Sequence, residues 1–184
     1  MYDAVVAGGS ISGLLAAREI AKSGYSVLVL EEGFEVGSPE HCGGLVSKNA
    51  LEELSIEPSQ KTFDSKIECA KIFSPEGKEI TINSMKQNII VINRRELDKQ
   101  AARQARDNGA EISVKTSFKE KINNGVRTSN GDIECKFFID CRGVSRLANV
   151  DRDGILLTAQ YEVYADWIKE GQVEVYFDQE KYPE

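Results

Sequence analysis

Apolar residues run almost without interruption over residues 2–7, which is typical of a strand buried on both faces of a parallel sheet. Residues 12–23 change to the spacing of a helix, and Gly24 supplies the stop. A second apolar run follows at residues 27–30. The order strand, turn, helix, strand predicts a βαβ unit with two parallel strands.

Helical spacing returns over residues 94–108, after a strand pattern at 88–92 and before another at 111–114. We therefore expect a second strand–helix–strand unit. Between the two units the chain should form a loop over residues 33–44, which is rich in glycine, and a short helix over residues 48–54.

Shorter runs that alternate in polarity mark further strands. They lie at 66–73, 79–82, 119–122, 126–129, 134–139, 155–164 and 172–177. The tripeptides Asn-Asn-Gly and Ser-Asn-Gly separate three of these runs, and both residue types tolerate the positive φ of tight turns. The patterns together predict an α/β fold, with a Rossmann-like sheet, an inserted antiparallel meander and the start of a further sheet near the end.

Composition narrows the classes of protein. The net charge is −7 and the basic residues are scattered, which argues against nucleic acid as a partner. The four cysteines include no Cys-x-x-Cys pair and His41 is the single histidine, so we expect no metal site. The first residues lack the features of a signal peptide, and no apolar run approaches the ~20 residues that span a bilayer. A cytoplasmic protein with reduced thiols is expected.

The turn after the first strand reads Gly-Gly-Ser-Ile-Ser-Gly from Gly8 to Gly13. Gly8 permits the tight turn and Gly13 lets the helix approach the sheet. The free N–H groups at the helix start can receive a pyrophosphate. Glu31 ends the second strand roughly twenty residues on, where its carboxylate can hold ribose hydroxyls and repel a 2′-phosphate. The sequence therefore predicts a dinucleotide with a free adenosine ribose rather than NADP.

Ser10 stands where the G-x-G-x-x-G pattern has its middle glycine. Its side chain takes space that backbone usually offers to the phosphate, although the hydroxyl can donate a hydrogen bond there. The alternative is an ordinary strand–turn–helix that binds nothing. The register of strand, helix and Glu31 argues against that alternative.

Cys42 stands in a loop with a proline before it and the pair Gly43 and Gly44 after it. Such a backbone can approach a planar ligand closely, and the thiol could serve as a proton donor or a nucleophile. The alternative is an unremarkable small loop residue. His41 could lower the pKa of the thiol when charged, or it could be a solvated loop residue.

Two further segments are candidates. Arg94 and Arg95 open the predicted helix at 94–108, where positive charge opposes the helix dipole unless an anion or a carboxylate is nearby. Arg94 is the anion-binding candidate of the two. Asp140 and Gly143 lie just after the strand at 134–139, and open α/β sheets bind ligands at the carboxyl ends of strands.

The order of these motifs resembles the geranylgeranyl reductase family, within the FAD proteins of the p-hydroxybenzoate-hydroxylase-like fold. The glycine turn is followed by a terminal glutamate, a Pro-x-x-Cys-Gly-Gly loop, an Arg-x-x-Leu-Asp helix start, a meander and an Asp-x-x-Gly-x-Ser loop. The cysteine loop over residues 37–47 is the most specific part, because related FAD hydroxylases lack it. The loop at Asp140 departs from the commoner Asp-Gly-x-x-Ser spacing.

The resemblance implies FAD as the bound dinucleotide. It places Arg94 on the diphosphate–ribityl side and Cys42 near the isoalloxazine and the reducible double bond, together with Gly43 and Gly44. The remaining residues implied to bind the cofactor are Gly8, Gly9, Ser10 and Gly13 at the pyrophosphate, Glu31 at the adenosine ribose, and Asp140 and Gly143.

The resemblance also implies an oxidoreductase that saturates isoprenoid chains, for example in archaeal ether lipids. A hydride from reduced flavin goes to one alkene carbon and a proton to the other. The implied partners are a prenyl-lipid substrate and an electron donor, which could be ferredoxin, a reduced nicotinamide or a deazaflavin. Peripheral contact with a membrane is compatible with a lipid substrate. The alternatives are a non-catalytic FAD-binding remnant, an FAD-dependent monooxygenase of the same fold and an NAD-dependent dehydrogenase.

By the same resemblance, residues 1–150 form the FAD- or NAD(P)-binding domain, with substrate-domain strands interleaved at 66–92. Residues 151–184 then begin a substrate-domain sheet. The later segments of the family, including a Gly-Asp stretch that returns to the FAD, do not occur in the sequence. We therefore expect a truncated chain.

Overall fold

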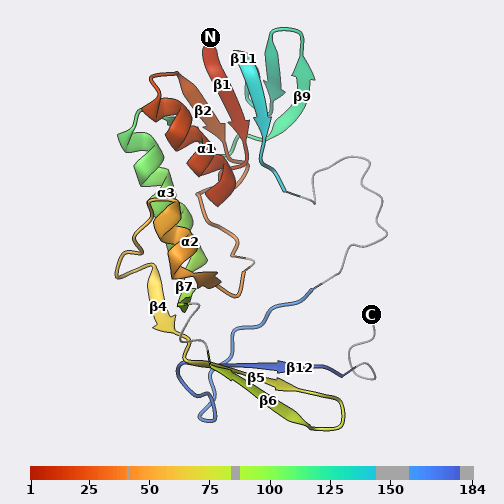
Figure 1. The fold of residues 1–184 in the computed structure, drawn as a ribbon. Helices are drawn as coiled ribbons and strands as arrows, with labels where there is room; N and C mark the ends of the chain where they lie inside the picture. The colour runs from red at the N-terminus through yellow and green to blue at the C-terminus, as the bar shows by residue number, and fades with distance from the viewer. Residues whose placement is uncertain (41, 84–87, 144–157, 179–184) are drawn as a thin grey trace. The chain divides into compact units, whose positions relative to one another are not determined.

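The computed structural model describes residues 1–40, 42–83, 88–143 and 158–178. The chain divides into two compact units (Figure 1). The first unit comprises Met1–Glu40 and Arg94–Asp151, and the second comprises His41–Asn93 and Arg152–Glu184.

The first unit is built on a six-stranded sheet. In their order across the sheet, its strands are β8 (Glu111–Ser113), β2 (Val27–Leu30), β1 (Tyr2–Ala7), β11 (Gly131–Asp140), β10 (Gly125–Thr128) and β9 (Phe118–Ile122). β1 pairs in parallel with β2 and β11, and β2 pairs in parallel with β8. β9, β10 and the first half of β11 form antiparallel hairpins. The predicted Rossmann-like sheet with an inserted meander is confirmed.

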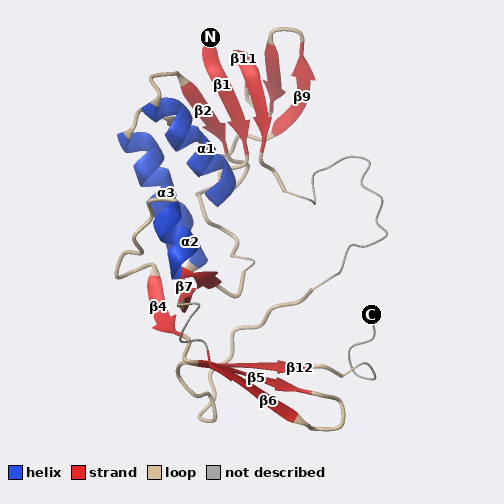
Figure 2. Ribbon diagram, in the orientation of Figure 1, coloured by secondary structure: helices blue, strands red, loops and turns tan. Residues whose placement is uncertain are grey.

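Two helices, α1 (Ile11–Lys22) and α3 (Arg94–Asp107), pack against each other in the first unit (Figure 2). The core that they share with the sheet is rich in alanine, which allows close packing of helices. Along β1, Ala4 and Val6 join this core, whereas Val5 joins the core on the opposite face. β1 is therefore buried on both faces, as its continuous apolar run predicts.

The second unit contains two three-stranded sheets and the short helix α2 (Lys48–Glu53). One sheet is antiparallel and has the order β3 (Leu45–Ser47), β7 (Ile89–Ile92), β4 (Phe63–Lys66). The other has the order β12 (Gln172–Tyr176), β5 (Cys69–Phe73), β6 (Glu79–Asn83). Among the residues that the structure describes, no helix is long and apolar enough to cross a membrane.

Three expectations about the strands are wrong. The strand before α3 does not share a sheet with β8, because β7 pairs with β3 and β4 in the second unit. The single strand expected at 66–73 is interrupted and divides between β4 and β5, which belong to different sheets. In the expected strand at 155–164, residues 158–164 form no strand, and 155–157 lie outside the described residues. Local polarity patterns predict extended chain, but they do not determine its partner.

Candidate functional site

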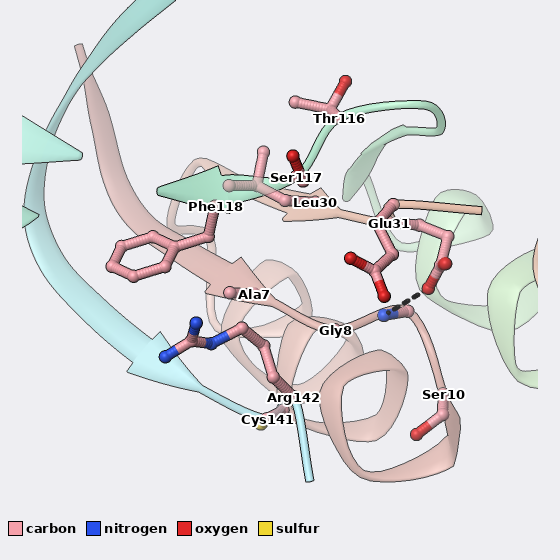
Figure 3. Close-up of a pocket in the computed structure, with 12 residues that line it drawn as sticks. Ala7, Gly8, Ser10, Leu30, Glu31, Thr116, Ser117, Phe118, Cys141 and Arg142 are labelled. Atoms are coloured by element: carbon pink, nitrogen blue, oxygen red, sulfur yellow. Dashed lines mark hydrogen bonds between the residues drawn. The ribbon is translucent and has the colours of Figure 1, made fainter. Parts of the chain in front are cut away.

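A pocket of about 140 Å³ opens at the carboxyl ends of β1, β2 and β11 (Figure 3). Open α/β sheets bind ligands at this edge. The lining residues come from the ends of the three strands and from the start of β9: Ala7, Gly8, Gly9, Ser10, Leu30, Glu31, Glu32, Thr116, Ser117, Phe118, Cys141 and Arg142.

The glycine turn is tightly packed at two positions. Gly8 has φ +110°, and a Cβ atom on it would lie 2.4 Å from the carbonyl oxygen of Cys141. A Cβ atom on Gly13 would lie 2.0 Å from the carbonyl oxygen of Gly8. Both distances are too short for any side chain, so the turn requires glycine at both positions. These glycines let the start of α1 and the loop after β11 approach the end of β1.

Glu31 faces the glycine turn across the pocket (Figure 3). Its Oε2 accepts a hydrogen bond of 2.9 Å from the Gly9 N–H, and its Oε1 accepts one of 2.7 Å from the Gly33 N–H. A Cβ atom on Gly9 would lie 2.7 Å from Oε2. Ser10 occupies the N-cap of α1, and its exposed hydroxyl makes no capping hydrogen bond. The structure therefore brings Gly8, Gly9, Ser10 and Glu31 to one pocket.

The loop after β11 presents Arg142 to this pocket. Arg142 holds Asp140 in a fork, with Nε–Oδ1 2.8 Å and Nη2–Oδ2 2.5 Å. This pairing lowers the pKa of Asp140. On its other side, the Arg142 guanidinium lies 4.4 Å from the centroid of the Phe118 ring. Asp140 is engaged within the protein and does not line the pocket, and Gly143 is exposed.

Sequence reasoning missed Arg142 and Phe118. An arginine two residues after an aspartate at a strand end is a recognisable candidate for a forked ion pair. Phe118 carried no comparable pattern, because its place in the pocket depends on how β9 pairs with β10.

Carboxylates of the protein surround the start of α3. The Arg94 N–H donates to Glu40 at 2.9 Å, and Arg95 forms an ion pair with Glu35. The Arg94 Nε donates to Asp98 Oδ1 at 3.2 Å. The sequence predicted an anion or a carboxylate near these arginines, and the protein itself supplies three carboxylates. The ion pairs with Asp98 and Glu35 therefore offset part of the positive charge at this helix start.

Cys42 belongs to the second unit, whereas the residues of the pocket belong to the first. Its Sγ accepts a hydrogen bond of 3.4 Å from the Gly44 N–H. A Cβ atom on Gly44, at φ +75°, would lie 2.2 Å from the Ile92 carbonyl oxygen, whereas one on Gly43 would meet nothing within 4 Å. Gly44 is thus required by its contact with β7. His41 lies outside the described residues.

A hollow of about 500 Å³ in the second unit begins beside the cysteine loop. Gly43, Leu45, Ile67, Val91 and Ile168 contribute to its lining. Polar side chains line the hollow as well, among them Asp64, Lys169 and Glu170, so its lining is mixed in character.

The fold is that of FAD-binding flavoproteins. The halogenase PltM, solved in complex with FAD, superposes on this chain with a TM-score of 0.60 and 18% sequence identity. The superposition covers 76% of this chain and 34% of the halogenase. At this identity the likeness shows the fold alone.

Closer relatives define the family. The chain is 38% identical over 135 residues to a digeranylgeranylglycerophospholipid reductase of Methanocella arvoryzae, covering 72% of this chain and 33% of the relative. It is 30% identical to digeranylgeranylglycerophospholipid reductase 2 of Methanothermobacter thermautotrophicus, covering 96% of this chain and 50% of the relative. The crystal structure of a geranylgeranyl bacteriochlorophyll reductase-like protein from Thermoplasma acidophilum matches with a TM-score of 0.81 and 27% identity, over 96% of this chain and 50% of that one.

The chain belongs to the geranylgeranyl reductase family. The matched part amounts to between a third and a half of these relatives' length. No protein-family model matches the chain. The family inferred from the order of the sequence motifs is confirmed.

Proposed function

We propose that this chain provides the FAD-binding part of a flavin-dependent reductase that saturates C=C bonds of isoprenoid chains. The observation that carries the proposal is the pocket in which Glu31 faces the glycine turn, in a chain of this family. The names of the relatives support a prenyl-lipid substrate.

The residues of the pocket suit the adenosine and diphosphate of FAD. Each carboxylate oxygen of Glu31 accepts one backbone hydrogen bond, which leaves lone pairs for ribose hydroxyls. The absence of a side chain at Gly9 keeps open the space beside Glu31. The pyrophosphate would bind at Gly8, Ser10 and the start of α1, which Gly13 allows to approach the end of β1. Arg94 would complete the site on the diphosphate–ribityl side.

When bound, reduced flavin supplies the hydride for one alkene carbon. The chain's own part is to bind the cofactor, to exclude water from the alkene and to provide the proton for the other carbon. Cys42 is the proposed proton donor, with Gly43 and Gly44 forming the loop around it. The hollow that begins at Gly43 offers apolar side chains to a prenyl chain, among them Leu45, Val91 and Ile168. The electron donor would be ferredoxin, a reduced nicotinamide or a deazaflavin, with peripheral membrane contact during lipid uptake.

Titration with FAD tests the cofactor site. We expect the purified chain to quench flavin fluorescence on binding and to melt at a higher temperature with FAD than without it. Glu31→Gln should weaken FAD binding about tenfold, because hydrogen bonds to a charged acceptor are lost. Glu134→Gln on β11 is the control, because it makes the same charge change at an exposed site. Wild-type protein without FAD binding, or equal affinities of the two variants, would contradict the proposal.

The reaction is tested with chemically reduced FAD and a prenylated glycerophospholipid. Mass spectrometry should detect the gain of two hydrogens per reduced bond. Cys42→Ala should slow this gain at unchanged flavin content, whereas Cys69→Ala in β5 should leave it unchanged. A wild-type rate for Cys42→Ala would remove the thiol from the mechanism. FAD binding without any reduction would favour the second candidate, a non-catalytic FAD-binding remnant.

A further inference from the structure

Asp98 is a buried acid that no step described above uses. It lies on the second turn of α3 and is 5% exposed. Taking a carboxylate out of water is unfavourable unless charged or hydrogen-bonding partners compensate. Burial accordingly raises the pKa of Asp98, while its partners lower it. A carboxylate at this buried position therefore needs a structural or functional explanation.

Two partners meet at the Asp98 carboxylate. One is the guanidinium of Arg94, whose Nε lies 3.2 Å from Oδ1. The other is the start of α1, where the backbone N–H of Ile11 lowers the pKa of Asp98. The first N–H groups of a helix have no partner within the helix and attract negative charge. Asp98 therefore holds the guanidinium of Arg94 and is stabilised as an anion by the first turn of α1.

The two side chains of the ion pair between Arg94 and Asp98 differ in exposure. The side chain of Asp98 is 7% exposed, whereas that of Arg94 is 26% exposed. Within the described part of the chain, only the Nε of the Arg94 side chain has an acceptor. The two Nη groups keep their donors, and guanidinium groups bind phosphate oxygens through such donors. The cation thus forms the accessible end of the pair and the anion forms the buried end.

We propose that Asp98 is a positioning residue for the cofactor, which fixes the Arg94 guanidinium beside the first turn of α1 so that its free Nη groups contact the FAD diphosphate. The inference rests on the proposed function, because it requires FAD at the glycine turn. Without Arg94, the Asp98 carboxylate would repel the diphosphate. It already experiences the negative charge of Glu31, which raises its pKa. Paired with Arg94, it contributes no net charge and removes the freedom of a long side chain.

A double-mutant cycle on FAD affinity tests the proposal. We expect Arg94→Gln to weaken FAD binding about tenfold and Asp98→Asn about fivefold, as for lost hydrogen bonds to charged groups. The double variant should bind no more weakly than Arg94→Gln, because Asp98 acts through Arg94. Asp107→Asn, at the exposed end of α3, is the matched control and should bind like wild type.

Other results would overturn the proposal. Additive losses in the double variant would mean that Asp98 only braces the two helices. Tighter FAD binding by Asp98→Asn would mean that the carboxylate acts by repulsion. Urea unfolding of each variant separates these effects from a general loss of stability. If Asp98 only braces the helices, Asp98→Asn lowers the unfolding midpoint equally in the wild-type and Arg94→Gln backgrounds.

A readout without flavin completes the test. In protein labelled with ¹⁵N-arginine, the Nε–H of Arg94 should give a resolved signal that exchanges slowly with water, assigned by its loss in Arg94→Gln. Asp98→Asn should abolish that protection and Asp107→Asn should preserve it. Protection that survives in Asp98→Asn would overturn the inference whether or not FAD binds. If wild-type protein binds no FAD, the proposed function fails and the cofactor role of Asp98 fails with it, whereas additive losses on a wild-type protein that binds FAD refute the inference alone.

Discussion

The two units of the chain differ in how completely their strands are covered. In the first unit, Val5, Val6 and Val29 on β1 and β2 are wholly inaccessible to solvent. In the second unit, all residues of β6 are exposed, including Ile80 at 64% and Ile82 at 50%. Within the described residues, the first unit thus closes its own core, whereas the β12-β5-β6 sheet leaves apolar side chains in contact with water.

The difference follows from sequence patterns of two kinds. β1 reads Tyr-Asp-Ala-Val-Val-Ala and requires a layer on each face, which the helices and the meander supply. β6 reads Glu-Ile-Thr-Ile-Asn, and an alternating strand requires a layer on one face only. No described residue buries that face of β6. The stability of the chain should therefore depend mainly on the first unit, and substitutions should show it.

The largest expected effect is that of Gly13→Ala. Its Cβ atom would lie 2.0 Å from the Gly8 carbonyl oxygen, and neither backbone segment can move without separating α1 from β1. We expect a loss of about 4 kcal/mol in the free energy of unfolding, measured by urea denaturation. Gly43→Ala is the matched control in the second unit, because its Cβ atom meets nothing within 4 Å. Equal midpoints for the two variants would show that the first unit is not the more tightly packed one.

The next effect compares two apolar side chains. Leu14→Ala removes a fully buried side chain from the core between α1 and the sheet, which should cost about 3 kcal/mol. Ile80→Ala removes an exposed side chain of β6, which should cost less than about 0.5 kcal/mol. Both values come from the same denaturation experiment. A cost for Ile80→Ala close to that for Leu14→Ala would show that β6 is covered in solution.

The sequence was sufficient for features that have a local cause. The strand at 2–7, the two long helices and the hairpins at their Asn-Gly turns all follow from polarity and turn chemistry within short segments. The approach of Glu31 to the glycine turn could also be predicted, because parallel neighbouring strands bring their carboxyl ends to one edge.

Features that depend on distant partners could not be predicted. Nothing within residues 89–92 distinguishes a strand of the first sheet from one of the second, since pairing is decided by segments far along the chain. The same holds for the ion pair between Asp140 and Arg142. Side-chain pairing of this kind depends on the local path of the loop, which the Asp-Cys-Arg-Gly pattern leaves open.

A smaller effect than those in the core concerns the ion pair between Asp140 and Arg142 and its response to low pH. The pKa of Asp140 is lowered chiefly by its hydrogen bond with Arg142, so the folded state binds the proton less readily than the unfolded chain. Its contribution to stability is therefore present above the ordinary aspartate pKa of about 3.9 and is lost as pH falls through the lowered value. The side chain is a third exposed, so we expect Asp140→Asn to cost less than about 1 kcal/mol near neutral pH.

Urea unfolding between about pH 2 and pH 7 measures this contribution. The acid-induced loss of stability should be less steep in Asp140→Asn than in wild type, and the two curves should converge at low pH. Glu79→Gln in β6 is the comparison from the second unit, because the pKa of Glu79 is lowered by Lys71 at an exposed strand. Its curve should follow that of wild type, since unfolding of the first unit dominates the transition. A larger change for Glu79→Gln than for Asp140→Asn would reverse the order of the two units, because the ion pairs at the exposed sheet would then contribute more to folding than those at the pocket.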